Sequence, residues 1–372
     1  MFDMGAVPRI QFGAGQAALL PEHVASFGAR DVTLIADPFL MQGADIPRVV
    51  EALRADAIRV RLFHAFSGEP KAHHVAAAAD VARGSDLVIG IGGGSALDVA
   101  KLAATLAGAP GGPMDYALGR TPLPAALPKI MVPTTAGTGS ETSATNIFSS
   151  DAGEKLWIWG PQTRAELVIL DPALTVSLPP HLTAWCGLDA LVHAFEAATN
   201  RNAHAGAAPY ALDALRHIAW ALPRAVAWPD DMEARSALLI ASCHAGIAID
   251  ACGTAVAHNL SHALARFAPV HHGHATAHAF AASLPWLIEA STPQLRAAAA
   301  ALDCALSDLP ERVEILMGAV DLGPLPQIPV TPEALIAEMQ AEANAPMLRN
   351  TVREVTPADL HHLAEATLAR AA

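Results

Sequence analysis

The chain has 372 residues, which is long enough for two domains that each bury a sizeable apolar core. Hydrophobic residues make up 52% of the sequence and charged residues 16%, a balance typical of compact globular proteins and not of disordered ones. The formal net charge of −13, without a basic stripe along the sequence, argues against a nucleic acid as the partner.

Signals for membranes or secretion are not expected either. The longest charge-free stretches contain prolines and histidines, so none is predicted to span a membrane. The first residues lack the basic-then-apolar pattern of a signal peptide. Four cysteines are scattered without C-x-x-C spacing or the pattern of a secreted disulfide framework. We therefore expect a soluble cytoplasmic protein with no membrane partner.

Two halves of the sequence differ in their predicted secondary structure. In the first half, residues 1–15 are predicted to form a strand and a turn, and alanine-rich stretches such as 75–83 alternate with apolar runs. Buried strands are predicted at 32–35, 87–91, 129–132 and 167–170. This alternation is typical of a parallel α/β sheet. After Pro180 the strand signals nearly vanish, so we predict an α/β domain over 1–180 and an all-helical domain over 181–372.

An acidic residue, Asp37, ends the first of these buried strands. A carboxylate there can accept hydrogen bonds from a ribose diol and would repel a 2′-phosphate, which favours NAD over NADP. In the ordinary dinucleotide fold this acid follows the glycine loop, whereas here it precedes it. Asp37 followed by proline is also typical of a simple turn.

Three glycines, Gly92 to Gly94, follow the strand at 87–91 and precede a predicted helix. Such a turn lets backbone N–H groups approach an anion, and the helix N-terminus behind it favours a phosphate. Ser95 with Asp98 three residues on has the form of an N-terminal cap, so the helix is predicted to start there. The motif G-x-G-x-x-G is not matched, because Leu97 occupies the last glycine position. A second polar loop, 133–141, contains threonines and glycines that could bind a cofactor.

The helical half contains the more specific signal. Asp189 and His193 are four residues apart, as are His258 and His262, so each pair is expected on one helix face; His272 follows ten residues later. Without a thiolate, nitrogen and oxygen donors of this kind suit Fe²⁺, Zn²⁺, Mn²⁺ or Ni²⁺. Three further histidines are expected to be neighbours and not ligands: His271, His274 and His278.

These motifs, in this order, resemble the iron-containing, or group III, alcohol dehydrogenase family. The likeness covers almost the full chain and is carried by residues 12–15, 92–101, 133–141, 171–175, 187–197 and 258–273. It implies a Rossmann-like α/β N-terminal domain that binds the dinucleotide and an all-α C-terminal domain that binds metal and is catalytic, in the dehydroquinate-synthase-like architecture.

The resemblance also implies roles for individual residues. The implied ligands of Fe²⁺ or Zn²⁺ are Asp189, His193, His258 and His272, and His262 would be the catalytic histidine beside nicotinamide and substrate. The positions that match contacts to NAD are Asp37, Gly93, Gly94, Ser95, Asp98, Thr134, Thr135, Thr138 and Lys155. The activity implied is hydride transfer between NAD(H) and a small alcohol or carbonyl, in a homodimer or larger oligomer.

Some features depart from the family pattern and leave the substrate open. His274 replaces a small apolar residue, 155–159 is unusually aromatic, and 348–353 lacks the common Asn-Pro-Arg. The alternatives are a glycerol-dehydrogenase-like enzyme, which would carry Lys at the place of Ser95, and a metal-free maleylacetate reductase, which would lack the ligands. Two further alternatives are a dehydroquinate-synthase-like lyase and a non-catalytic metal-binding or regulatory protein.

Overall fold

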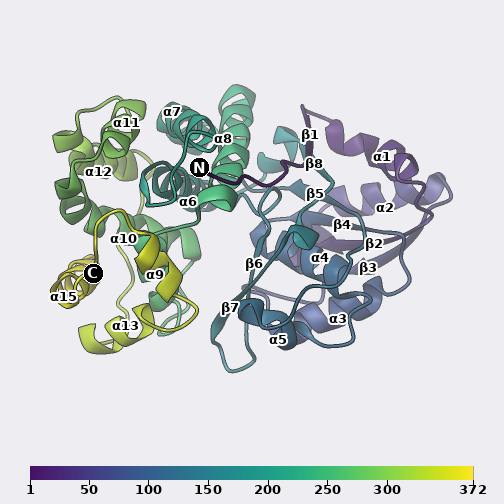
Figure 1. The fold of residues 1–372 in the computed structure, drawn as a ribbon. Coiled ribbons are helices and arrows are strands. Elements are labelled where there is room, and N and C mark those ends of the chain that lie inside the picture. Colours follow the sequence, from purple (N-terminus) through teal and green to yellow (C-terminus); the bar gives the residue numbers. More distant parts are fainter. Residues whose placement is uncertain (372) are drawn as a thin grey trace. The chain divides into compact units, whose positions relative to one another are not determined.

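The computed structural model describes residues 1–371, which form two compact units (Figure 1). The α/β unit consists of Ala6–Thr135 and Ser140–Thr175. The helical unit consists of Met1–Gly5, Ala136–Gly139 and the chain from Val176 onward. Two short segments from the first half of the sequence thus belong to the helical unit.

The α/β unit is built on a six-stranded parallel sheet with the strand order β1-β8-β5-β4-β2-β3. Its strands are β1 (Arg9–Phe12), β2 (Asp31–Ala36), β3 (Arg59–Phe63), β4 (Leu87–Gly92), β5 (Lys129–Pro133) and β8 (Leu167–Leu170). The four central strands β2, β4, β5 and β8 are buried along their whole length, which explains their uninterrupted apolar runs. The predicted parallel α/β sheet and its four buried strands are confirmed.

Helices cover the sheet through alternate side chains of its strands. The helices of this unit are α1 (Leu20–Ser26), α2 (Asp45–Ala55), α3 (Ala72–Ala82), α4 (Gly94–Leu106) and the short α5 (Pro113–Tyr116). Leu34, Ile89 and Val132 of successive strands belong to one core with the apolar side chains of α1 and α2. A second core joins α3 and α4 to a hairpin described next.

Two strand features were missing from the sequence prediction. An antiparallel hairpin of β6 (Thr145–Ser149) and β7 (Lys155–Trp159) forms its own two-stranded sheet. The edge strand β3 was also missed, because its two arginines interrupt a short apolar run that is only partly buried. The aromatic run at 155–159 is therefore a strand, with Leu156 and Ile158 buried and Trp159 exposed.

Buried charges of α4 hold this hairpin in place. The Lys101 ammonium donates to the backbone oxygens of Ser143 at 3.1 Å and Thr145 at 3.0 Å. The Asp98 carboxylate accepts from the Ile147 N–H at 3.0 Å and from the Ser140 hydroxyl. Because buried charges are stable only when paired and hydrogen-bonded, these contacts fix the chain after β5 to α4.

The helical unit has no strand among the described residues, apart from an isolated bridge between Leu325 and Ala371. Its helices are α6 (Pro180–Thr199), α7 (Ala208–Ala227), α8 (Met232–Cys252), α9 (Val256–Leu264), α10 (His272–Leu287), α11 (Pro293–Ala301), α12 (Leu309–Ala319), α13 (Pro332–Met339), α14 (Ala345–Asn350) and α15 (Pro357–Leu368). The long helix α6 packs against α7, α8 and α10, and α9 packs against α10. The predicted change from α/β to helical structure is confirmed.

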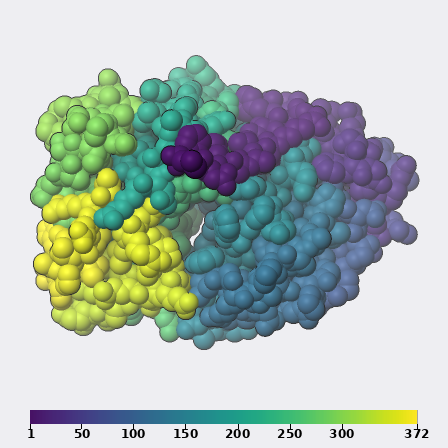
Figure 2. Space-filling view, in the orientation of Figure 1, coloured from purple at the N-terminus to yellow at the C-terminus, as the bar shows by residue number. Residues whose placement is uncertain are grey.

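One helix, α8, is long and apolar enough to cross a membrane by length and composition. In its most apolar window, 61% is buried inside the structure, as expected for a core helix. The first residues of the chain lie exposed on the surface (Figure 2), where the Phe2 ring stacks on His204 of the same unit at a centroid distance of 4.2 Å.

Candidate active site

Four side chains of the helical unit converge on one point. Asp189 and His193 come from α6, His258 from α9, and His272 is the first residue of α10. Each offers one ligand atom, and these atoms all lie within 4.8 Å of one another. The structure thus brings together the four residues that the sequence predicts as metal ligands; we call them the Asp-His cluster.

Buried atoms at the centre of this cluster lack partners. Asp189 is 2% exposed and His258 is 1% exposed. Asp189 Oδ1 and His258 Nε2 have no hydrogen-bond partner, and the 3.6 Å between them is too long for a hydrogen bond. Leaving such atoms unpaired is costly, and a divalent cation between them would satisfy both.

The other ring nitrogen of each histidine is already engaged. His258 Nδ1 lies 2.7 Å from Glu196 Oε2, and His193 Nδ1 lies 3.3 Å from the backbone oxygen of Gly137. His272 Nδ1 lies 3.2 Å from the Ser261 hydroxyl. Partners at Nδ1 fix the ring orientation and leave Nε2 as the ligand atom, which is the usual arrangement around a protein-bound metal. The donor set therefore fits a divalent cation such as Fe²⁺ or Zn²⁺.

Electrostatics in the cluster agree with this fit. Burial alone would raise the pKa of Asp189. The neighbouring histidines outweigh that effect and hold its pKa below the usual value, so the carboxylate is ionised. Burial lowers the pKa of His193, which favours the neutral ring that can bind a cation. Burial alone would lower the pKa of His258, but Glu196 and Asp189 raise it to about 9. A cation that binds His258 must therefore displace a proton from the ring.

His262 lies beside the cluster and outside the group of four. One turn after His258 on α9, its ring centroid is 6.4 Å from that of His258 and 5.3 Å from that of His272. The further histidines take other contacts: Nε2 of His274 and Nε2 of His278 each lie 2.9 Å from the backbone oxygen of Gly323. His271 is exposed and packs against Trp185 at a centroid distance of 4.8 Å.

In the α/β unit, the glycine turn is the start of α4. Gly92 has a φ of 149°, and a Cβ added there would lie 2.7 Å from Ala96 Cβ and 2.8 Å from Asp37 Cβ, so only glycine fits. The prediction that Ser95 and Asp98 cap the helix is wrong: α4 begins at Gly94 with Gly93 as its N-cap and no side-chain cap. The carboxylate of Asp98 is instead taken up by Ser140 and Ile147. Backbone N–H groups thus remain at the start of α4, as an anion site needs.

Several of the predicted cofactor residues gather at the carboxyl edge of the sheet. Asp37 follows β2, Gly93 follows β4, and Thr134 follows β5, three strands that are direct neighbours. The Thr134 N–H donates to the Gly92 oxygen at 3.0 Å, and a Cβ on Gly93 would lie 3.3 Å from the Thr135 methyl group. Asp37 also accepts from the Phe39 N–H at 2.9 Å, so it caps the short 3₁₀ helix Pro38–Gln42 as well.

Two predicted cofactor residues lie elsewhere. Lys155 is on β7, where its ammonium is 3.4 Å from Glu69. Thr138 belongs to the segment Ala136–Gly139 of the helical unit. Glu196, by contrast, was not singled out from the sequence although it contacts His258; its position three residues after His193 on the same helix is the signal that could have found it.

The α/β unit with a glycine turn, together with a helical unit that holds an Asp-His cluster, defines a metal-dependent oxidoreductase of the dehydrogenase type. The model of iron-containing alcohol dehydrogenases matches residues 8–172, and that of the C-terminal region of the Fe-containing alcohol dehydrogenase family matches residues 183–364. The chain belongs to the iron-containing alcohol dehydrogenase family and is an oxidoreductase, so the other enzyme classes and the non-catalytic alternative are not needed.

Individual relatives agree with this assignment. Long-chain-alcohol dehydrogenase 1 of Geobacillus thermodenitrificans (strain NG80-2) is 37% identical over 275 residues, which cover 73% of this chain and 69% of that protein. The probable alcohol dehydrogenase EutG of Escherichia coli (strain K12) is 35% identical over 71% of this chain and 68% of its own. A solved structure of sulfoacetaldehyde reductase from Bifidobacterium kashiwanohense in complex with NAD⁺ is 26% identical, with a TM-score of 0.90 over 99% of each chain.

Close contact between α10 and α6 yields a prediction. A Cβ added to Gly273 would lie 2.2 Å from the backbone oxygen of Trp185 and 3.2 Å from Asp189 Cβ, so Gly273→Ala must move α10, and His272 with it. We expect Gly273→Ala to destabilise the chain by about 1–3 kcal/mol, as overpacking does, and to weaken metal binding. The measurements are thermal unfolding and metal content after dialysis against Zn²⁺.

The matched control is Gly318→Ala on α12, where an added Cβ meets nothing within 4 Å. This variant should keep the metal content of the unaltered chain. Unchanged Zn²⁺ content in Gly273→Ala would contradict the placement of His272 in the cluster.

Proposed function

We propose that this chain is an NAD(H)-dependent alcohol dehydrogenase or aldehyde reductase that uses a divalent cation, Fe²⁺ or Zn²⁺. The observation that carries the proposal is the Asp-His cluster, whose buried Asp189 Oδ1 and His258 Nε2 have no hydrogen-bond partner among the described residues. When bound, the cation would act as a Lewis acid on a substrate oxygen while the nicotinamide exchanges a hydride with the substrate carbon.

The two units divide the binding tasks. The helical unit would hold the cation through one carboxylate and three imidazoles. In the α/β unit, the uncapped start of α4 binds the pyrophosphate of NAD through backbone N–H groups. Asp37 accepts hydrogen bonds from the ribose and repels a 2′-phosphate. The remaining contacts to the cofactor are proposed for Gly93, Gly94, Ser95, Thr134, Thr135, Thr138 and Lys155, with Asp98 holding the loop that follows β5.

His262 is proposed as the catalytic residue that takes the hydroxyl proton of the alcohol, or returns it to the carbonyl oxygen. Support comes from its place one helical turn after His258 and 5.3 Å, between ring centroids, from His272. A histidine suits this task because its ordinary pKa lies near neutral pH. Three rings and one carboxylate would hold the cation, and His262 lies beside them, outside the group of four.

Cellular setting and assembly are part of the same proposal. The four cysteines are all free in the structure, which supports a reducing compartment such as the cytoplasm. A homodimer or larger homo-oligomer is proposed from the family resemblance. The proposed substrate is a small alcohol or aldehyde.

Oxidation of NADH with a panel of aldehydes tests the function. The chain, loaded in turn with Fe²⁺ and with Zn²⁺, should turn over at least one aldehyde, and a chelator should abolish the activity. NADH should be preferred over NADPH because of Asp37. Absence of turnover with every carbonyl and both cations would overturn the proposal, and metal binding without turnover would favour a binding protein that kept the fold.

The role of His262 is tested by His262→Ala. Loss of a general acid or base lowers kcat by about 10²–10⁴-fold and should alter its pH dependence, while metal content stays unchanged. The control is His361→Ala on α15, because His361 is an exposed histidine far along the chain from the cluster. If His262→Ala kept full kcat with the same pH profile, the proton role would be wrong.

A further inference from the structure

We propose that Glu196 is a positioning residue of the metal centre: its carboxylate sets the tautomer of the His258 ring and fixes the backbone from which that ring projects. The inference rests on the proposed metal site and adds a residue that does not itself touch the cation. Glu196 lies on α6, seven residues after Asp189 and three after His193, and is 3% exposed.

The first argument is the number of donors that Glu196 serves. Its Oε2 accepts from the Ala255 N–H at 2.6 Å and lies 2.7 Å from His258 Nδ1. Its Oε1 accepts from the Ala257 N–H at 2.8 Å. Because both Glu196 oxygens accept from backbone N–H groups, the carboxylate is placed as an acceptor, and the proton between Glu196 and His258 belongs to Nδ1. His258 Nε2 is then the ring atom that gives up its proton when a cation binds, and it lies 3.6 Å from Asp189 Oδ1.

The second argument is that Glu196 completes the start of α9. This helix begins at Val256, and its N-cap residue, Ala255, has no side chain that can accept a hydrogen bond from the first turn. Glu196 supplies the missing acceptor from another helix, and its negative charge is favourable at a helix N-terminus. The residue that orients the ring therefore also holds the helix that carries it.

Amide side chains secure the carbonyl groups of the same connection. Asn200 Nδ2 donates to the backbone oxygens of Cys252 at 3.1 Å and Gly253 at 2.7 Å. Asn350 Nδ2 donates to the oxygens of Cys252 and Thr254, each at 2.8 Å. With its N–H groups bound by Glu196 and its carbonyls by amides, the segment between α8 and α9 is held in one conformation.

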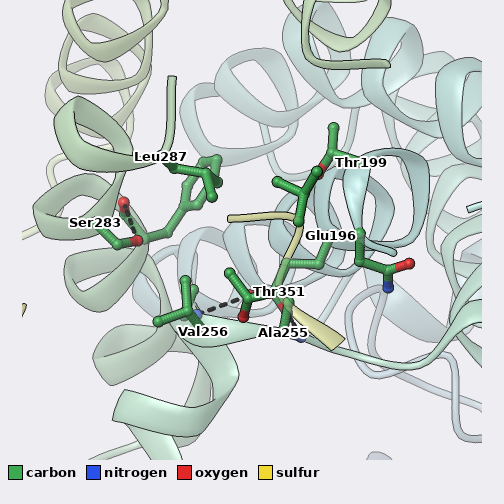
Figure 3. A pocket seen from close by; sticks show the side chains of 11 residues that line it. Glu196, Thr199, Ala255, Val256, Ser283, Leu287 and Thr351 are labelled. Atoms are coloured by element: carbon green, nitrogen blue, oxygen red, sulfur yellow. Dashed lines mark hydrogen bonds between the residues drawn. The ribbon is translucent and has the colours of Figure 1, made fainter. Parts of the chain in front are cut away.

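The polar side chains that line the space beside Glu196 have partners of their own. Glu196 borders a small cavity that also touches Ala255 and Val256 (Figure 3). Three hydroxyls line this cavity, and each donates to a backbone oxygen of its own helix or turn: Thr199 to Phe195, Ser283 to Phe280, and Thr351 to Met347. The carboxylate thus acts on the 255–258 segment.

The chain offers a matched control. Asp213 Oδ2 lies 2.8 Å from His244 Nδ1, which is a second carboxylate–histidine pair in the helical unit. That pair is partly exposed and is no part of the Asp-His cluster. Asp213→Asn and Glu196→Gln therefore make the same chemical change, and only the second is expected to reach the metal.

Zn²⁺ affinity and histidine tautomers test the proposal. A glutamine at 196 can donate to His258 Nδ1, which moves the ring proton to Nε2 and blocks the ligand atom. We expect Glu196→Gln to raise the Zn²⁺ dissociation constant about 10–100-fold, the usual effect of losing such a partner, and Asp213→Asn to leave it unchanged. Nitrogen NMR of the metal-free chain, recorded at a pH where the His258 ring is neutral, should show His258 as the Nδ1–H tautomer in the unaltered protein and as Nε2–H in Glu196→Gln.

Equal Zn²⁺ affinity in Glu196→Gln and the unaltered chain, or equal weakening in both variants, would overturn the proposal. If Glu196→Gln does not fold, the unaltered Zn²⁺-loaded chain still decides, because ligation through His258 Nδ1 would contradict the assignment and ligation through Nε2 would support it. The test of Glu196 measures metal affinity and not turnover, so it can fail or succeed independently of the proposed function. A chain that binds Zn²⁺ through His258 without oxidising NADH would overturn the proposed function and leave this inference standing.

Discussion

The buried carboxylate of Asp189 is the constraint on which the rest of the site depends. An ionised group that is 2% exposed must be compensated, since a buried unpaired charge is among the most expensive features a fold can contain. Among residues 1–371, the ion pairs of Asp189 are with histidines and not with Lys or Arg. The chain surrounds Asp189 with three imidazoles, whose nitrogens lie 3.5 to 3.8 Å from its oxygens, beyond hydrogen-bond distance. A cation with two positive charges is the natural complement of that arrangement.

Three helices of the helical unit, α6, α9 and α10, hold the side chains of the Asp-His cluster in place. α6 contributes two ligands and Glu196, α9 contributes His258 with His262, and α10 brings His272 close because Gly273 has no side chain. Outer contacts to Glu196 and Ser261 leave His258 and His272 with Nε2 facing Asp189, whereas the Nδ1 atom of His193, which also contacts Gly137, lies 3.8 Å from Asp189 Oδ2. The cluster is therefore preorganised, and binding a cation need not reorder the helices.

The sequence was informative where chemistry and local geometry coincide. Asp189 and His193 could be paired because residues four apart share a helix face, and the sheet could be predicted because buried parallel strands are continuous apolar runs. Local sequence patterns gave the wrong prediction, or none, where the partner of a side chain lies far away along the chain. Asp98 has the spacing of a cap, but Ser140 and the hairpin at Ile147 take its carboxylate. Glu196 was overlooked because His258, which it holds, is 62 residues away along the chain. The short edge strand β3 carried no clear apolar alternation.

X-ray absorption at the zinc edge of the Zn²⁺-loaded chain tests the central claim most directly, because it reports the atoms bound to the cation. The account predicts a first shell of nitrogen and oxygen only, at about 2.0–2.2 Å, with the outer scattering of three imidazole rings. Replacement of Asp189 by Asn should change that shell. A sulfur neighbour at about 2.3 Å, or a shell without imidazole scattering, would contradict the assignment of Asp189, His193, His258 and His272 as the metal centre.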